Sequence, residues 1–424
     1  MRIDRLKLEN FGGFESFEIE FDPHFTLLVG DNASGKTSIL DALTVLLESW
    51  VGGIKGDEKA GGIPPGYIRI VPHVFQDSSS FERQLPVRLQ ASGLVMGTPV
   101  TWARQRNRER GGTSYSETRN VAQMARQAGK SVRENSPVLL PLICSYGAER
   151  LWDEAPKPQR RPKRETKNGK PSRLDGYEDC LDFGIQEAVL SDWVRAQVLD
   201  GFQLGSKTAA LRAAERAITS CVAGARTLIY SEREKELAFE IEPFGWQLLS
   251  NLSHGQRIMV ILIGELARRA TSLNPALGDD ALEETPGVVL IDELDLHLHP
   301  KWQRHVIHDL KRTFPLVQFI ATTHSPQLIG EARPCEIRKL EGGRAYSPSR
   351  SFGLDSSRVL GEIQDAPPRN LDVESLIHSI AKAIDEEKFE DARKLLVNLE
   401  AEVGPDDPEA TRSRSLIKFL ENPI

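Results

Sequence analysis

A run of ten residues near the start of the chain has the form of a phosphate-binding loop. It reads Val29-Gly30-Asp31-Asn32-Ala33-Ser34-Gly35-Lys36-Thr37-Ser38 and fits the pattern G-x-x-x-x-G-K-[ST] at every fixed position. In such a loop the backbone N–H groups face the phosphates, Lys36 reaches the β and γ phosphates, and Thr37 offers its hydroxyl to Mg²⁺. An apolar run before the loop predicts a strand, and helical spacing of apolar residues after it predicts a helix. The pattern therefore predicts a nucleoside triphosphatase that binds its nucleotide through residues 30–38.

A second segment ends an apolar run with two acids. It reads Val288-Val289-Leu290-Ile291-Asp292-Glu293. In a triphosphatase, Asp292 would hold Mg²⁺ directly or through water, and Glu293 would orient and deprotonate the attacking water. Apolar strands that end in acids are common, so this segment alone is weak evidence. It indicates a triphosphatase only together with the phosphate loop.

A third segment, Leu252-Ser253-His254-Gly255-Gln256-Arg257, opens an apolar helix. The free N–H groups of a helix start and the helix dipole both favour phosphate, so Ser253 and its neighbours form a natural anion site. The alternative is that Ser253 only caps the helix.

The elements around these segments predict an α/β fold. A strand over 288–292, a helix over 300–314 and a strand over 317–322 alternate as in a parallel sheet. Residues 1–350 are expected to form the head, with a β-rich insertion at 51–135, a basic mobile loop at 153–177 and a helical lobe at 178–285. Residues 351–424 are expected to form a tail of three short helices. The basic loop, Lys157 to Arg173, is either a solvated linker or a contact for the phosphates of DNA or RNA.

Composition limits the classes of protein that this chain can belong to. Its 424 residues are 39% hydrophobic and 27% charged, which is typical of a globular protein, and a net charge of −7 argues against a uniformly basic surface that coats nucleic acid. The apolar runs are too short to cross a membrane and the N-terminus lacks the core of a signal peptide, so we expect a cytoplasmic protein without membrane contact. The four cysteines are far apart, which favours reduced thiols over a zinc site or disulfides.

Taken in this order, the segments resemble the ATP-binding-cassette ATPases, within them the branch of SMC, RecF and OLD proteins. The family's signature L-S-x-G-Q matches residues 252–256, and its Walker B strand with the following D-loop matches residues 290–300. Its switch histidine matches His324, and its N-F-x-x-F start matches Asn10 to Phe14. Relatives usually carry a basic residue after the Asn-Phe pair, where this chain has Gly12. The Q-loop residue is not assigned, because Gln76 and the segment from Tyr146 to Arg150 are equal candidates.

The resemblance implies a P-loop head that binds ATP and Mg²⁺ between two chains. Ser253, Gly255 and Gln256 of one chain would complete a site whose catalytic groups are Lys36, Glu293 and His324 and whose metal ligands are Thr37 and Asp292. A single set of motifs implies a homodimer, which could assemble further. The histidine would contact the γ phosphate, and Asp295 would touch the partner.

The overall plan also resembles the PtuA-like ATPases of bacterial anti-phage systems, which act with a separate nuclease. The resemblance implies an ATPase that serves as sensor or scaffold and controls a separate effector. The alternative is a RecF-like repair ATPase that binds DNA through Lys157 to Arg173. An OLD-type nuclease is disfavoured, because Asp372 and Glu374 begin a predicted helix, whereas a nuclease of that type needs its acids at strand ends.

Overall fold

The computed structural model describes residues 1–57, 61–75, 78–148, 172–182 and 187–421. The chain divides into two compact units, Met1–Gly353 and Leu354–Ile424. The division expected from the sequence lies between residues 350 and 351. Each unit is described by itself below.

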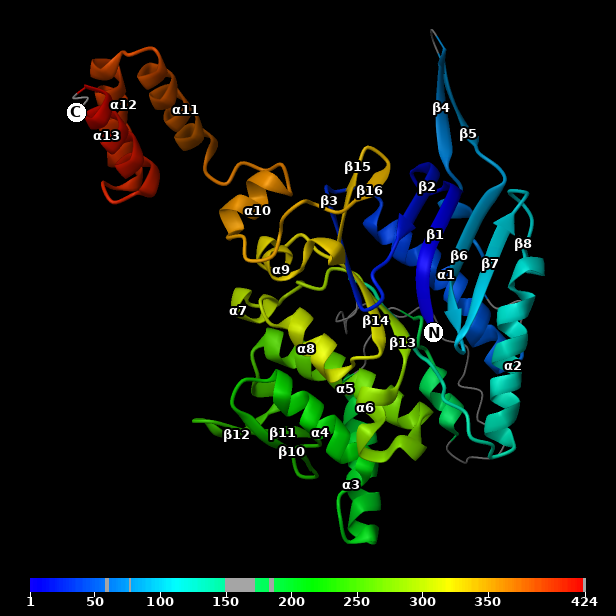
Figure 1. Cartoon of the computed structure of the whole chain (residues 1–424). Coiled ribbons are helices and arrows are strands. Elements are labelled where there is room, and N and C mark those ends of the chain that lie inside the picture. Colours follow the sequence, from blue (N-terminus) through cyan, green and yellow to red (C-terminus); the bar gives the residue numbers. More distant parts are fainter. Residues whose placement is uncertain (58–60, 76–77, 149–171, 183–186, 422–424) are drawn as a thin grey trace. The chain divides into compact units, whose positions relative to one another are not determined.

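A six-stranded sheet forms the centre of the first unit (Figure 1), with the strand order β16-β15-β3-β14-β13-β9. All neighbouring strands pair in parallel except β16, which is antiparallel to β15. The parallel strands are almost continuous runs of buried residues, as expected for strands covered on both faces. The strands are β3 (Phe25–Gly30), β9 (Leu142–Tyr146), β13 (Gly287–Ile291), β14 (Val317–Thr322), β15 (Ile337–Glu341) and β16 (Arg344–Tyr346).

A second, antiparallel sheet covers the long helix α1 (Lys36–Lys55), which contacts strands of both sheets. By length and composition α1 is the one helix among the described residues that is apolar enough to cross a membrane, and 78% of that stretch is buried. Because two sheets enclose the helix, its apolar character belongs to the core. The strands of this sheet are β1 (Arg2–Phe11), β2 (Phe14–Glu20), β6 (Val87–Val95), β7 (Thr98–Arg106) and β8 (Thr113–Ser114).

The segment expected to be a β-rich insertion, 51–135, has helices at both of its ends. Residues up to Lys55 belong to α1, and Arg119–Arg133 forms α2, which packs against α1. Between them lie β6 to β8 and a separate hairpin of β4 (Ile70–Phe75) and β5 (Ser78–Arg83). Helix α2 was missed because small residues form its contact with α1: a Cβ added to Gly53 would lie 2.8 Å from the Cβ of Ala125.

The lobe expected at 178–285 contains the predicted helices and, in addition, a three-stranded antiparallel sheet. The sheet follows the first two helices and leads into the helix that starts at the L-S-x-G-Q segment. The elements are α3 (Glu187–Leu204), α4 (Ala209–Cys221), β10 (Ala225–Ser231), β11 (Glu236–Ile241), β12 (Gly245–Leu248), α5 (His254–Leu273) and α6 (Ala281–Glu284).

The basic loop expected at 153–177 lies mostly outside the described residues, but its C-terminal end is folded. Arg173–Tyr177 forms a turn of 3-10 helix, and the Arg173 guanidinium donates to the carbonyl oxygens of Leu273 at 2.8 Å and Val138 at 2.7 Å. The expectation is therefore wrong for Arg173, because this cation is used to hold the segment against the helix α5.

The helix expected over 300–314 is two helices, α7 (Pro300–Gln303) and α8 (Val306–Thr313). After β14 comes the short helix α9 (Pro326–Glu331), whose cap is Ser325. With these elements the predicted fold class, an α/β P-loop head with a β-rich N-terminal part, a helical lobe and a helical tail, is confirmed.

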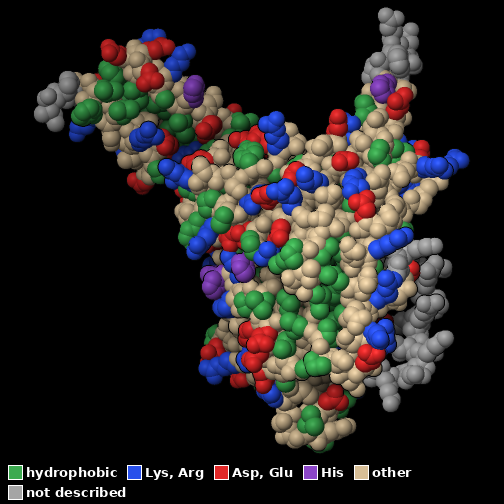
Figure 2. All heavy atoms as spheres, turned by 45° about the vertical axis from the view of Figure 1, so that its right-hand side comes forward, with side chains coloured by type: hydrophobic (Ala, Val, Ile, Leu, Met, Phe, Trp, Pro, Cys, Tyr) green, Lys and Arg blue, Asp and Glu red, His purple; other side chains and the backbone are tan. Residues whose placement is uncertain are grey.

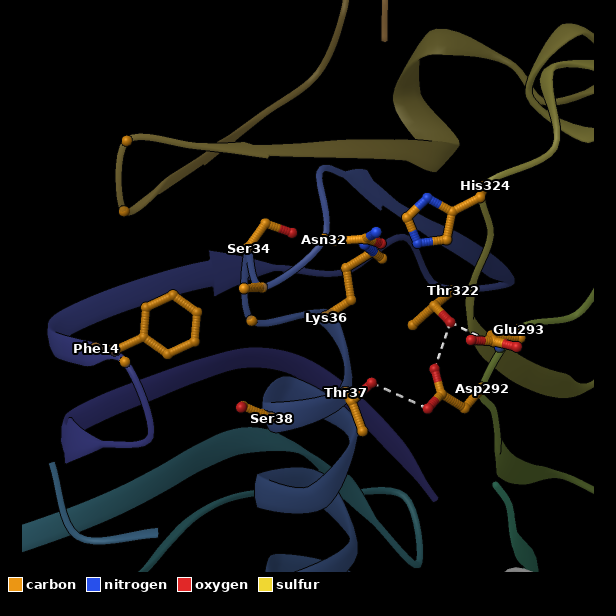
Figure 3. Close-up of a pocket in the computed structure, with 15 residues that line it drawn as sticks. Phe14, Asn32, Ser34, Lys36, Thr37, Ser38, Asp292, Glu293, Thr322 and His324 are labelled. Atoms are coloured by element: carbon orange, nitrogen blue, oxygen red, sulfur yellow. Dashed lines mark hydrogen bonds between the residues drawn. The ribbon is translucent and has the colours of Figure 1, made fainter. Parts of the chain in front are cut away.

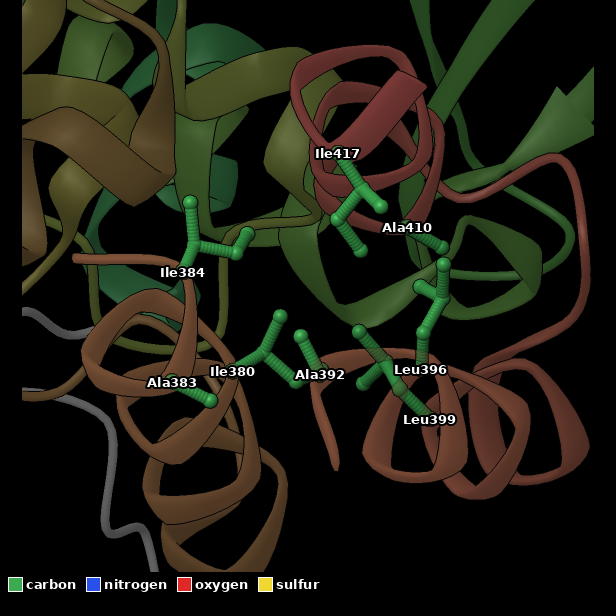
Figure 4. Close-up of a cluster of buried hydrophobic side chains, with 8 residues drawn as sticks. All are labelled: Ile380, Ala383, Ile384, Ala392, Leu396, Leu399, Ala410 and Ile417. Carbon is green, nitrogen blue, oxygen red and sulfur yellow. The ribbon is translucent and has the colours of Figure 1, made fainter. Parts of the chain in front are cut away.

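The second unit is helical. Its helices are α10 (Ser356–Glu362), α11 (Leu371–Asp385), α12 (Phe389–Val403) and α13 (Pro408–Glu421). Eight buried side chains from the last three helices meet in one apolar cluster (Figure 4), which gives this unit its own core. They are Ile380, Ala383, Ile384, Ala392, Leu396, Leu399, Ala410 and Ile417.

Candidate active site

A cavity of about 640 Å³ opens where the strands β3, β13 and β14 end (Figure 3). Its volume lies in the range of small-molecule sites, and its place at the carboxyl ends of parallel strands is where α/β folds bind ligands. The lining residues are Gly13, Phe14, Asn32, Ala33, Ser34, Gly35, Lys36, Thr37, Ser38, Asp292, Glu293, Thr322, His324, Gly342 and Gly343. The phosphate loop, the two acids and the histidine, which the sequence places far apart, thus line one cavity.

The two fixed glycines of the loop are required by close approach of other groups. A Cβ added to Gly30 would lie 2.7 Å from the carbonyl oxygen of Leu340 on β15. Gly35 has a left-handed φ of 95°, and a Cβ there would lie 2.3 Å from the ring of Phe14. Phe14 belongs to the N-F-x-x-F segment, so that segment braces the loop. Gly12 in the same segment has a φ of 56°, a left-handed conformation that glycine adopts without strain.

The ammonium of Lys36 is folded into the loop that it follows. Nζ donates to the carbonyl oxygens of Gly30 at 2.8 Å and of Asp31 at 2.9 Å. Burial lowers the pKa of Lys36 below its ordinary value, and the carboxylate of Asp292 opposes this shift. The lysine is therefore held beside the space that the loop encloses, at the N-terminus of α1, where backbone N–H groups and the helix dipole favour an anion.

The carboxylate of Asp292 lies between two threonine hydroxyls, one from the first turn of α1 and one from the end of β14. Oδ2 accepts from Thr37 Oγ1 at 3.0 Å, and Oδ1 accepts from Thr322 Oγ1 at 2.5 Å. Thr37 and Asp292 thus present a hydroxyl and a carboxylate oxygen to the same place, and hard oxygen donors of this kind suit Mg²⁺. The residues present fit a nucleoside triphosphate with Mg²⁺.

Glu293 is held in an uncommon backbone conformation beside this pair. Its φ is 49°, in the left-handed region, and its N–H donates to Thr322 Oγ1 at 2.7 Å. Non-glycine residues in this region persist where the surroundings impose them, often at functional sites. Both Glu293 and His324 line the cavity, and His324 has an exposed side chain.

Thr322 and the turn of Gly342 and Gly343 are lining residues that the sequence analysis did not select. Thr322 is fully buried and ends β14, one position after the residue that pairs with Ile291 of β13. A polar residue at the end of a buried strand, two positions before the histidine, was a signal that could have found it. The two glycines form the tip of the β15–β16 hairpin, for which the local sequence gives a turn and nothing more.

The L-S-x-G-Q residues lie outside the cavity lining. Ser253 Oγ accepts from Gln256 N at 3.4 Å, and Gln256 Oε1 accepts from Ser253 N at 3.1 Å, which is a capping box. Gly255 is buried against the backbone at residues 297–299, where an added Cβ would lie 3.2 Å from the carbonyl oxygen of His297. Ser253 and His254 remain exposed at the start of α5. Within a single chain these residues are therefore capping and packing residues with an exposed face.

Neither candidate for the Q-loop residue joins the site among the described residues. Gln76 and residues 149–150 lie outside the described part of the chain. Tyr146, at the end of β9, is 3% exposed and is not among the lining residues.

Comparison with known proteins gives matches over most of the chain. Residues 5–196 match an AAA domain family, and residues 206–330 match a second one described as AAA domain, putative AbiEii toxin, Type IV TA system. The chain is 26% identical over 480 residues to the Retron Ec83 probable ATPase of Escherichia coli, with 96% of this chain and 85% of that protein covered. It is 24% identical over 440 residues to the Septu protein PtuA of Bacillus thuringiensis, covering 96% of this chain and 95% of that protein.

Among solved structures, the chain is similar to an SMC head crystallised with the C-winged helix domain of ScpA. The TM-score is 0.47 at 15% identity, with 82% of this chain and 96% of that chain covered. The two AAA domain models and the matches to the retron and Septu proteins, together with the cavity and its phosphate loop, show that the chain is an ATP-hydrolysing AAA ATPase that is related to PtuA.

Proposed function

We propose that the chain binds ATP between two copies of itself and hydrolyses it there. The observation that carries this proposal is the location of the L-S-x-G-Q segment. Its serine and histidine are exposed at the start of a long helix, yet they do not line the cavity that is lined by the phosphate loop, the two acids Asp292 and Glu293, and His324. A second chain that presents Ser253 and the N–H groups of its α5 to this cavity would complete the anion site.

In this site each side chain has a chemical task. The loop N–H groups and Lys36 bind the triphosphate, and Thr37 and Asp292 hold Mg²⁺. When bound, Mg²⁺ supplies positive charge that offsets the charge developing on the phosphate oxygens. Glu293 accepts a proton from the attacking water, and His324 donates a hydrogen bond to the γ phosphate.

The proposed role is that of an ATP switch that controls a separate effector, expected to be a nuclease, in anti-phage defence in the cytoplasm. Contacts to the γ phosphate across two chains exist only in the closed dimer, so ATP favours that state and hydrolysis removes the preference. The role is supported by relatives from retron and Septu systems that match over 96% of the chain. A nuclease of the OLD type in the second unit is not supported, because Asp372 and Glu374 lie in the first turn of the helix α11 and not at strand ends.

The alternative, a repair ATPase that binds DNA, has less support in the described residues. On the face drawn in Figure 2, basic and acidic side chains are interspersed and form no broad basic area. Arg173, one of the cations of the proposed contact, is bound to backbone carbonyl oxygens. The remaining cations, Lys157 to Lys170, lie outside the described residues.

A mixing experiment tests the shared site. Lys36→Ala removes the phosphate ligand from one side, and Ser253→Arg blocks the helix start on the other, so each variant alone should be inactive. A mixed dimer has one site with both sides intact and one with neither. Equal amounts of the two inactive variants should therefore recover about a quarter of the wild-type ATPase rate per chain if the chains pair at random.

One control makes the result specific. Glu293→Gln mixed with Lys36→Ala should recover nothing, because both substitutions lie on the same side of the site, so that each site of a mixed dimer carries one of them. No recovery from a freshly mixed and co-refolded pair of Lys36→Ala and Ser253→Arg would count against the shared site. Adding duplex DNA to wild type separates the roles, since a DNA-dependent rate would favour the repair ATPase.

A further inference from the structure

We infer that Thr322 is a positioning residue for ATP hydrolysis, which holds the metal-binding carboxylate of Asp292 and the backbone of Glu293 in place. The inference rests on the proposed roles of these two acids. It gives a role to a residue two positions before His324 that was not expected in the site and whose side chain is completely buried.

Thr322 makes three contacts with the segment that follows β13. Its hydroxyl donates to Asp292 Oδ1 at 2.5 Å and accepts from Glu293 N at 2.7 Å, and its carbonyl oxygen accepts from Leu294 N at 2.9 Å. The contacts follow from the sheet: β13 and β14 are parallel neighbours paired at Ile291 and Ala321, so the next residues of both strands lie side by side. One threonine therefore binds three consecutive residues of the catalytic segment.

The hydrogen bond from Thr322 gives the two oxygens of the Asp292 carboxylate different partners. Thr322 binds Oδ1 from the side of β14, while Oδ2 faces Thr37 on the phosphate loop (Figure 3). Because the hydroxyl donates a charge-assisted hydrogen bond from a β-branched side chain with restricted χ1, it fixes the rotation of the carboxylate. The oxygen that faces Thr37 is then held ready for a metal ion.

The bond to Glu293 supports a strained backbone. A left-handed φ at a non-glycine residue is strained and persists only where other contacts impose it. The hydroxyl of Thr322 and its carbonyl oxygen accept from the N–H groups of Glu293 and Leu294, which are the groups that this turn directs toward β14. The next residue repeats the arrangement, since Thr323 Oγ1 donates to Asp295 Oδ1 at 2.6 Å.

The test compares substitutions that keep the hydroxyl with substitutions that keep the shape. Thr322→Val keeps the volume and loses the hydroxyl, whereas Thr322→Ser keeps the hydroxyl and loses the methyl group. The readout is Mn²⁺ binding followed by electron paramagnetic resonance in the presence of the non-hydrolysable β,γ-imido analogue of ATP. Thr322→Val should weaken Mn²⁺ binding by about 10- to 100-fold, the effect of one hydrogen bond to a charged group, and Thr322→Ser should stay close to wild type. Analogue binding in EDTA should be unchanged in both.

A residue that merely fills space would give the opposite order, with Thr322→Ser more impaired than Thr322→Val, and that order would overturn the inference. If Thr322→Val does not fold, Thr322→Ala and Thr322→Ser form the second comparison, because both lack the methyl group and only the alanine lacks the hydroxyl. Asp292→Asn is the control for the proposed metal site. If Asp292→Asn loses Mn²⁺ binding and Thr322→Val binds Mn²⁺ like wild type, the role of Thr322 is refuted and the metal site stands. If Asp292→Asn also binds Mn²⁺ normally, the proposed metal role of Asp292 is refuted as well.

Discussion

Gly35→Ala should distort the phosphate loop, because two independent features of the structure exclude a side chain at this position. The backbone has a left-handed φ of 95°, and an added Cβ would lie 2.3 Å and 2.6 Å from two ring carbons of Phe14. Either the loop or the ring must then move. The loop is the softer of the two, since Phe14 is 7% exposed and stacks on Phe17 at a centroid distance of 4.3 Å.

The expected cost follows from these two features. A Cβ in the left-handed region costs about 1–2 kcal/mol, and an extra methyl group in a packed contact costs about 1–3 kcal/mol. The loop must keep its shape to bind phosphate, so most of this cost should appear in the nucleotide-bound state. The sum of about 2–5 kcal/mol corresponds to nucleotide binding that is weaker by about 30-fold to several thousand-fold.

Calorimetric titration with ATP and Mg²⁺ measures this loss, and a double-mutant cycle with Phe14→Leu identifies its cause. If the clash with the ring is responsible, the pair of substitutions should bind better than the sum of the single effects predicts, with a coupling of about 1 kcal/mol or more. Gly112→Ala is the matched control, since an added Cβ there meets nothing within 4 Å and φ is not left-handed. Wild-type affinity in Gly35→Ala, or strictly additive effects in the cycle, would refute the reasoning.

Two further predictions concern stability. Glu265→Gln should lower the free energy of unfolding by about 3–5 kcal/mol, because Glu265 is 5% exposed and its carboxylate accepts from Arg269 Nε at 2.8 Å, so the substitution leaves a buried guanidinium without its charge partner. The exposed pair of Glu283 with Arg216 is the control in urea denaturation, and Glu283→Gln should cost less than about 1 kcal/mol. Asp41→Asn should stabilise the protein at pH 7, since burial raises the pKa of Asp41 while the hydrogen bond from Tyr67 opposes this shift. A raised folded-state pKa means that stability is lost as pH rises through it, so the advantage of the amide should shrink as pH falls toward the ordinary value of 3.8. If the stability advantage of Asp41→Asn over wild type instead grew as pH falls, this pH dependence would be wrong.

Much of the fold could be predicted because the signals are local. The buried strands β3, β13 and β14 are short apolar runs, and the alternation of Leu6 and Leu8 in β1 reports a strand with one buried face. Three helices of the second unit, α11, α12 and α13, correspond to the three helices expected in the tail, whereas α10 was not expected.

Other elements gave weak signals for physical reasons. The buried side of α2 consists largely of alanines such as Ala122 and Ala125, so its apolar pattern is faint although its contact with α1 is close. The strands β10 and β12 expose large side chains, including Ile229 and Trp246, and their patterns therefore lack clear alternation. The end of the basic loop at Arg173 is fixed by carbonyl groups 35 and 100 residues away, which no local pattern records.

The phosphate loop could be predicted from the sequence alone, because Gly30 to Thr37 are consecutive and their conformation depends on the types of those residues and the strand and helix beside them. How the two acids reach that loop depends on the folded sheet. Asp292 lies 255 residues from Thr37 and 30 from Thr322, and the parallel pairing of β14 with both β13 and β3 brings the three side chains within hydrogen-bond distance. Register is a property of two paired strands. The role of Thr322 therefore becomes visible only when the sheet has formed.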